Sequence, residues 1–313
     1  MNPIDTLANA RRFEPRDDPR LSGRRWPGGA GLALSFVLNI EEGAELSIAD
    51  GDASNEAVHE ITHRLDGGPD FCLGTHFEYG ARAGYRRIVQ RFAERGLPLT
   101  LNVCGRALER TPWVADDARR HGFELCGHGW RWESPAGMDE ASERESIART
   151  VATISRLAGR APAGWHCKGS RSPNTRRLLR EQGGFAYDSD DYGDDLPHLL
   201  DFGDGRPPHV VLPYGFDTND MRFFDRGGFV RAADFSGYAG DAIAALLPES
   251  RRVPRMLTIG LHTRIIGRPG RIAGLDGLLQ QVAGLGDAVC VMTREAIARA
   301  WLAAMSPAPR SGA

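Results

Sequence analysis

Short apolar runs alternate with amphipathic segments along almost the whole chain. The runs are rich in β-branched residues and predict strands over residues 32–39, 99–104, 123–126, 163–166, 185–188, 209–213, 257–262 and 288–292. The segments between most of them have helical spacing and predict helices over 82–95, 112–121, 139–157, 174–182, 232–247, 272–285 and 294–303. A strand followed by a helix, repeated many times, indicates a parallel sheet.

Polar side chains stand where several of these strands end. Glu41 and Glu42 follow the first strand, His128 follows the third, Asp190 follows the fifth and His262 ends the seventh. A barrel with its active site at the carboxyl ends of the strands explains polar groups on so many strands better than an open sheet with one switch point. We therefore expect an α/β fold, a distorted (β/α) barrel of seven to eight strands.

Composition narrows the class of partner. The 39 basic and 41 acidic residues give a formal charge of -2, which favours neither nucleic acid nor an anionic membrane, so we expect a small molecule. The five cysteines show no CxxC spacing, which fits a reducing cytoplasm. The N-terminus lacks a secretory pattern, and no apolar run reaches membrane-spanning length. The predicted organisation is an arm over 1–26, one catalytic domain over 27–303 and a flexible tail over 304–313.

A zinc-peptidase pattern, H-E-x-x-H, occurs at His59 to His63. That chemistry needs both imidazoles on one long helix, with a third ligand downstream. Here the sequence DGGPD ends the segment within a few residues, and no further ligand is indicated. We interpret the match as accidental, on an exposed helix.

The stretch CGHGWRWE, residues 126–133, presents His128 beyond a strand. A second histidine one helical turn later would make a metal pair, but the residue there is Trp132, whose indole offers an N–H and no lone pair for a cation. The alternatives at His128 are a functional group, a helix cap, or a divalent metal such as zinc shared with Glu42.

Two further stretches are candidates for chemistry. In GWHCKGSRSPNTRR, residues 164–177, Arg171 precedes a stiff Ser-Pro step and suits the orientation of a carboxylate, or lies at the surface. The roles of the adjacent His166, Cys167 and Lys168 stay open. In IGLHTRIIGRPGR, residues 259–271, His262 is a candidate proton donor beside Arg264, with a neutral core histidine as the alternative.

Taken in order, these stretches resemble the polysaccharide deacetylase family, which uses a T-F-D-D-G stretch, an H-x-x-x-H stretch, an R-x-P stretch, an Asp-bearing strand end and a late histidine. More closely, FVLNIEEG, FEYGARAG, HGWRWE, RSPNTRR, YDSDDYGDDLP, PYGFDTNDMRF and GLHTRIIGRPGR are similar to the branch of metal-independent bacterial allantoinases. The resemblance runs from about residue 26 to residue 301. It implies a distorted barrel, hydrolysis of a carbon–nitrogen amide bond and a homotetramer.

The resemblance also implies roles for single residues. Glu41 matches the catalytic base, His128 the first metal histidine, Arg171 the arginine that orients the base, and His262 the general acid. Glu42 stands at the metal-binding aspartate. The branch shares the glutamate pair and the tryptophan, and is described as working without a metal. Ile40 departs from a usual tyrosine, and GWHCKGSRSPN departs from a shorter GWYTGRTSPN pattern.

We therefore expect a cytoplasmic hydrolase that opens a cyclic amide without a cofactor, with allantoin to allantoate in purine catabolism as the favoured reaction. Expected catalytic residues are Glu41, His262, Arg171 and His128, and expected substrate contacts are Glu42, Trp132, Asp190, Arg264 and Asn102. The alternatives are another hydantoin or cyclic imide, a metal-dependent deacetylase of an N-acetylated sugar, and a ligand-binding protein without turnover.

Overall fold

The strands form a single curled sheet in a computed structural model that describes residues 19–305. Within that range the sheet has nine strands: β1 (Leu32–Ile40), β2 (Thr100–Val103), β3 (Glu124–Gly127), β4 (Gly164–Trp165), β5 (Tyr187–Asp188), β6 (His198–Leu200), β7 (His209–Val211), β8 (Arg255–His262) and β9 (Val289–Val291). The order is β6-β7-β5-β4-β3-β2-β1-β8, with β9 also paired to β1. Every pairing is parallel except that of β6 with β7. The curled sheet is a half-barrel, which confirms the predicted fold class.

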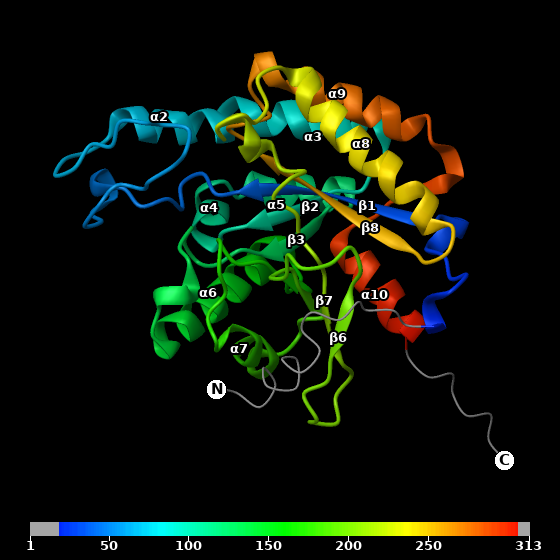
Figure 1. The fold of residues 1–313 in the computed structure, drawn as a ribbon. Coiled ribbons are helices and arrows are strands. Elements are labelled where there is room, and N and C mark those ends of the chain that lie inside the picture. The colour runs from blue at the N-terminus through cyan, green and yellow to red at the C-terminus, as the bar shows by residue number, and fades with distance from the viewer. Residues whose placement is uncertain (1–18, 306–313) are drawn as a thin grey trace.

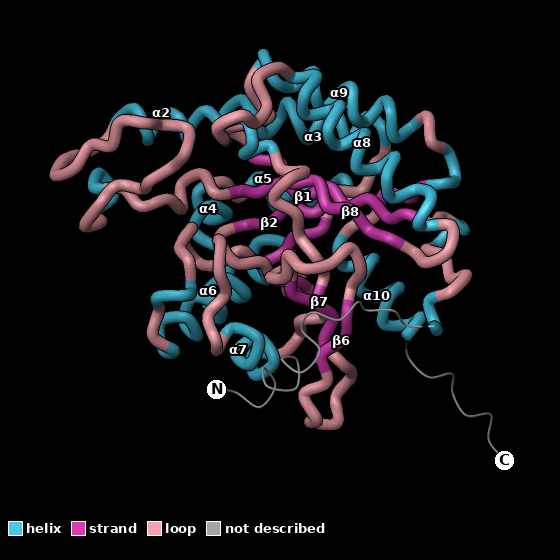
Figure 2. The backbone as a smooth tube through the Cα atoms, viewed as in Figure 1, coloured by secondary structure: helices cyan, strands magenta, loops and turns pink. Residues whose placement is uncertain are grey.

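The helices cover both flanks of this sheet (Figures 1 and 2). They are α2 (Phe71–Tyr79), α3 (Tyr85–Arg95), α4 (Gly105–Arg110), α5 (Trp113–His121), α6 (Glu140–Ala158), α7 (Thr175–Gln182), α8 (Ala232–Ser250), α9 (Pro269–Ala283) and α10 (Arg294–Met305). In Figure 1, α3, α8 and α9 lie together above the long strands β1 and β8, with α6 and α7 on the opposite side. Among residues 19–305, no helix combines the length and apolar character needed to cross a membrane.

Apolar spacing explains why these segments fold as predicted. In α3, Ile88, Val89 and Phe92 recur at helical intervals and are buried, and Gly96 ends the helix with a φ of 60°, which favours glycine. The eight expected strands and seven expected helices each correspond to an observed element. Sequence patterns missed β6, α2 and α4. These elements lack a long apolar repeat, and the three-residue β6 depends on its partner strand β7.

The gap between β7 and β8 is spanned by the chain that follows β7. Asn219 forms a parallel bridge with Gly260 of β8, and the Thr218 hydroxyl donates to the Thr258 carbonyl at 2.6 Å. Arg294, at the start of α10, is fully buried beneath this junction. Its guanidinium donates to Ser189 Oγ (2.8 Å), Thr258 Oγ1 (2.8 Å) and the carbonyls of Leu212 (3.0 Å) and Pro213 (2.9 Å). One arginine thus satisfies acceptors from three parts of the half-barrel.

Replacing this buried arginine should destabilise the fold. Arg294→Met leaves buried carbonyl and hydroxyl oxygens without their donors, and we expect the free energy of unfolding to fall by about 3 kcal/mol. Urea denaturation followed by circular dichroism measures the change. The matched control is Arg299→Met on the same helix, whose side chain is 67% exposed and pairs with Glu295. It should change stability by less than about 1 kcal/mol. Equal stability of the two variants would show that the junction does not depend on Arg294.

Candidate active site

The polar groups predicted at strand ends meet at one edge of the sheet. Glu41 and Glu42 directly follow β1, His128 directly follows β3, and His262 is the last residue of β8. The register pairs Asn39 of β1 with His262, which brings the carboxyl ends of β1 and β8 side by side. All four of these residues are buried, with at most 3% of each exposed. The carboxyl groups of Glu41 and Glu42 therefore face the protein interior and not the solvent.

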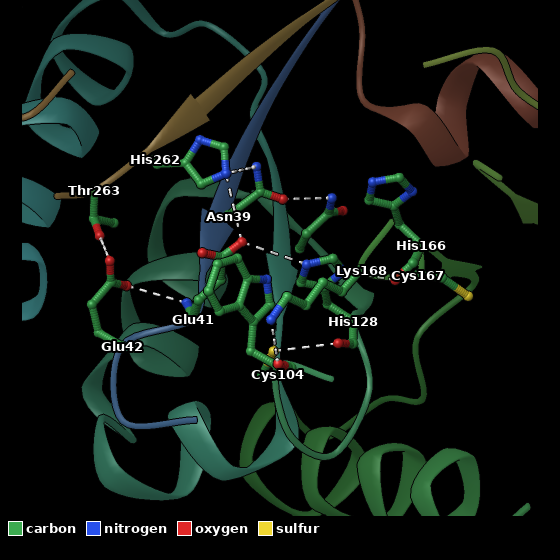
Figure 3. A network of polar contacts seen from close by, with 12 residues as sticks. Asn39, Glu41, Glu42, Cys104, His128, His166, Cys167, Lys168, His262 and Thr263 are labelled. Atoms are coloured by element: carbon green, nitrogen blue, oxygen red, sulfur yellow. Dashed lines mark hydrogen bonds and ion pairs between the residues drawn. The ribbon is translucent and has the colours of Figure 1, made fainter. Parts of the chain in front are cut away.

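Glu41 lies at the centre of this group (Figure 3). Its Oε1 is 3.6 Å from His128 Nε2 and 3.6 Å from His262 Nε2, while Oε2 is 2.6 Å from Arg264 Nη1. Burial alone would raise the pKa of Glu41, but Arg264, then His262 and His128, outweigh it and hold this pKa well below its ordinary value. Glu41 is therefore ionised, with two imidazoles facing one carboxylate oxygen.

The adjacent Glu42 has a different environment. Its Oε1 accepts a hydrogen bond from the Thr263 hydroxyl, and its Oε2 lies 3.2 Å from the backbone N–H of Glu41. Burial raises the pKa of Glu42, and the charge of Glu41 adds to this effect against the attraction of Arg264. The pKa values of the two neighbouring glutamates are therefore shifted in opposite directions, so Glu42 takes up a proton more readily than Glu41.

His262 is held by a buried carboxylate that the sequence did not single out. The Nδ1–H of His262 donates to Asp220 Oδ1 at 2.7 Å, and Asp220 Oδ2 accepts the backbone N–H groups of His262 (2.7 Å) and Ile266 (3.1 Å). Burial lowers the pKa of His262, but the charges of Asp220 and Glu41 outweigh burial and raise it. Asp220 lies in the PYGFDTNDMRF stretch, yet nothing local distinguishes it from the aspartates around it.

Arg264 forms the contact with Glu41 that the sequence predicted for Arg171. Its Nη1 pairs with Glu41, its Nε donates to Glu60 Oε1 at 2.8 Å, and its guanidinium carbon lies 4.5 Å from the centre of the Phe77 ring. Arg264 is 1% exposed and is engaged by both Glu41 and Glu60, and its predicted contact with substrate stays a prediction. The arginine expected to orient Glu41 was Arg171, which is half-buried and donates to the Ser172 carbonyl at 3.2 Å. In the structure, the guanidinium that pairs with Glu41 belongs to Arg264.

Glu60 is the residue of the H-E-x-x-H pattern that contacts Arg264. The expected exposed helix is wrong, because residues 59–63 form turns and bends, and only His59, Thr62 and His63 are exposed. Although burial raises it, the pKa of Glu60 is lowered to about 2 by His76, whose Nε2 lies 3.8 Å from Glu60 Oε1, and by the charge of Arg264. Glu60 therefore supplies the second negative charge beside the buried guanidinium. Only the tertiary contact with Arg264 reveals this role.

Trp132 packs between two cations. The Lys168 ammonium lies 3.7 Å from the centre of the Trp132 ring, and the Arg264 guanidinium carbon lies 5.0 Å from it. Lys168 also donates to the Trp132 carbonyl at 3.0 Å and pairs with Glu56 at 3.1 Å. Trp132 is 7% exposed, and its ring also packs against that of Phe77, with 6.0 Å between the ring centres.

His166 and Asp190 form a second layer beside His128. The rings of His128 and His166 are stacked at 5.3 Å, and Tyr214 stacks on His166 at 4.4 Å. The Nδ1–H of His128 donates to the His166 carbonyl at 2.7 Å, which turns Nε2 toward Glu41. Asp190 Oδ1 accepts the backbone N–H of Cys167 at 2.7 Å and lies 3.2 Å from His166 Nδ1. Asp190 thus shapes the loop that carries these residues.

The comparisons with known proteins agree on one family. The family model described as polysaccharide deacetylase matches residues 67–187. A protein of Schizosaccharomyces pombe named "Putative polysaccharide deacetylase" is 34% identical over 302 residues, which span 89% of this chain and 92% of that protein. The chain belongs to the polysaccharide deacetylase family.

Solved structures extend this agreement to the fold. The crystal structure of PuuE allantoinase is 42% identical, with a TM-score of 0.83 over 92% of this chain and 98% of that one. A probable polysaccharide deacetylase from Pseudomonas aeruginosa PAO1 is 43% identical, with a TM-score of 0.83 over 88% of this chain and 92% of that one. The chain is therefore a hydrolase of the deacetylase family.

The metal site that the family resemblance implies does not fit the side chains present here. Trp132 has no lone pair to offer, and Glu42 Oε1 is engaged by Thr263. His128 Nε2 faces the Glu41 carboxylate, which itself pairs with Arg264. In the part of the chain that the structure describes, no three His, Cys, Asp or Glu side chains are grouped to hold a metal ion. The arrangement provides a carboxylate with two imidazoles and a guanidinium.

Removing the charge of Asp220 should move the pH range of activity. The predicted role of His262 as an acid requires its protonated form, so we expect activity to be lost as pH rises through its raised pKa. Asp220→Asn removes the charge that raises this pKa, so we expect the alkaline limb of the kcat/KM profile to shift to lower pH. The control is Asp225→Asn, which alters an exposed aspartate in the same segment and should leave the limb in place. An unmoved alkaline limb in Asp220→Asn would contradict this assignment.

Proposed function

We propose that this protein hydrolyses the C–N bond of a cyclic amide. The observation that supports it most is the ionised Glu41 with His262 Nε2 3.6 Å from the same carboxylate oxygen. A base and a protonated acid at this separation serve one hydrolytic cycle, because one takes a proton from water and the other returns one to the leaving group. The opposite directions of their pKa shifts favour the ionised form of Glu41 and the protonated form of His262.

The proposed reaction has two proton transfers. Glu41 takes a proton from water as the oxygen attacks the ring carbonyl, giving a tetrahedral oxyanion. The C–N bond then breaks, its electron pair stays on nitrogen, and His262 protonates that nitrogen. The product carries a carboxylate at one end of the opened ring. Donors that could stabilise the oxyanion are His128 and backbone N–H groups, whereas Arg264 acts by keeping Glu41 ionised.

The favoured substrate is allantoin, opened to allantoate in purine catabolism. The likeness to PuuE allantoinase over nearly the whole of both chains supports this choice. Ile40 and the GWHCKGSRSPN segment depart from the allantoinase pattern near the site, so another hydantoin or a cyclic imide is the second candidate. Sugar deacetylation, suggested by the names of other relatives, would require a metal that this donor set does not fit.

The expectations about compartment, cofactor, oligomeric state and partner are also part of this proposal. We propose a cytoplasmic enzyme that works without a cofactor, forms a homotetramer and has a small-molecule substrate as its partner, without nucleic acid or membrane. The family resemblance supports the tetramer, and the balanced charge supports the class of partner. A binding protein that kept the site and lost turnover is the alternative outside enzymology.

A substrate panel with one variant tests the reaction. Wild type should open at least one of allantoin, hydantoin, dihydrouracil and succinimide faster than it deacetylates N-acetylglucosamine, measured as product carboxylate. Glu41→Gln removes the base, and we expect kcat to fall by about a thousandfold or more while ligand binding persists in calorimetry. Turnover of N-acetylglucosamine alone would overturn the proposal. Ligand binding without turnover in wild type would indicate the non-enzymatic alternative.

Removal of metal ions by a chelator tests whether the reaction needs one. Dialysis against EDTA, followed by elemental analysis, should leave kcat unchanged, because Arg264 and His262 keep Glu41 ionised without a Lewis acid. The control is readdition of zinc, which should not increase the rate. Stoichiometric zinc in the purified protein, with activity lost on chelation and restored by zinc, would contradict the mechanism.

A further inference from the structure

Asn102 is a fully interior amide next to the catalytic group. It lies on β2, and the sheet register places it between Asn39 on β1 and Cys126 on β3. Its side chain is 1% exposed. The Asn102 Nδ2 group donates to Asn39 Oδ1 at 3.0 Å, and Asn39 Nδ2 lies 3.4 Å from His262 Nε2. Asn102 is therefore one side chain away from the proposed acid. Figure 3 shows Asn39 beside His262.

The contacts of Asn39 determine which way both amides face. Asn39 Nδ2 lies 3.1 Å from the carbonyl of Leu261, which can only accept a hydrogen bond. Asn39 must therefore keep its N–H groups on that side and turn Oδ1 toward Asn102. An oxygen facing Asn102 requires a donor, so Asn102 presents Nδ2 to Asn39. The Oδ1 of Asn102 is consequently turned away from Asn39, and β3 is the neighbouring strand on its other side.

This oxygen lacks a donor. Among residues 19–305, Asn102 Oδ1 is a buried oxygen without a hydrogen-bond partner. Its neighbour in the register offers none, because Cys126 Sγ is directed to the Gly127 carbonyl at 3.7 Å. A buried acceptor without a partner is costly, and such atoms in native proteins usually have a functional explanation. The other amide atoms are all engaged, which leaves this one lone-pair position for an N–H from outside the chain.

We propose that Asn102 Oδ1 accepts an N–H of the substrate, and that this contact selects rings in which the nitrogen that does not depart carries a hydrogen. The inference rests on the proposed function. His262 protonates the departing nitrogen, and Asn102 lies beyond Asn39 from that histidine, so its oxygen meets a different part of the ring. The substrate class is therefore a cyclic ureide with N–H groups on both sides of its carbonyl, such as a hydantoin. Succinimide has no second nitrogen.

The test compares two rings of the same size. Hydantoin carries the second N–H, whereas oxazolidine-2,4-dione has an oxygen at that position and keeps the departing imide. A site that hydrogen-bonds an N–H rejects an analogue that lacks it, so we expect wild-type kcat/KM to favour hydantoin by about a hundredfold. Asn102→Leu removes the acceptor at similar volume and should reduce this ratio to within about threefold of unity. Cys126→Ala, at the neighbouring register position, adds no donor and should keep the wild-type ratio.

The outcomes separate this inference from the proposed function. Both rings opened by wild type at equal kcat/KM, or an unchanged ratio in Asn102→Leu, would overturn the role of Asn102 while leaving cyclic amide hydrolysis intact. Failure of wild type to open any ring would instead overturn the proposed function. Thermal unfolding of each variant, together with turnover of succinimide, shows whether Asn102→Leu is folded. A folded variant that loses hydantoin turnover and keeps succinimide turnover supports the assignment.

Discussion

A buried guanidinium determines how this site is charged. Arg264 is 1% exposed, and burying an isolated cation would be strongly destabilising, so it requires anionic partners. Glu41 and Glu60 supply them, and the rings of Phe77 and Trp132 lie over the same cation. Burial raises the pKa of Glu42, and the charge of Glu41 adds to this effect. Arg264 Nη1 lies 2.6 Å from Glu41 but 3.6 Å from Glu42, so the guanidinium favours the ionised form of Glu41 more strongly.

The curled sheet brings these charges together. Glu41 follows β1, Arg264 follows β8, and the two strands pair over residues 32–39 of β1. Glu60 arrives on a loop that follows β1, and Asp220 on the chain that spans β7 and β8. Arg294 satisfies acceptors on the inner side of that spanning segment, near the Thr218 and Asn219 contacts with β8. The stability of the junction and the protonation of His262 are therefore linked through the same short segment.

Local sequence patterns were sufficient to predict the site residues that lie at the carboxyl ends of strands. Glu41, His128 and His262 stand directly after, or at the end of, strongly apolar runs, and their meeting follows from a parallel sheet. Their partners depend on loops whose paths no local pattern describes. Glu60 was hidden within H-E-x-x-H, Asp220 was one aspartate among several, and Arg171 had the more conspicuous local setting beside proline. The orphaned oxygen of Asn102 could emerge only from the orientation of Asn39, which the Leu261 carbonyl determines.

The central claim is that Arg264 keeps a buried Glu41 ionised before substrate binds. The most direct measurement is the infrared difference spectrum between wild type and Glu41→Gln, recorded in heavy water at mildly acidic pH. The account predicts that wild type contributes a carboxylate band that the variant lacks, because the pKa of Glu41 lies well below its ordinary value. A difference band from a protonated carboxyl group instead would show that Glu41 is neutral and would contradict its role as the base.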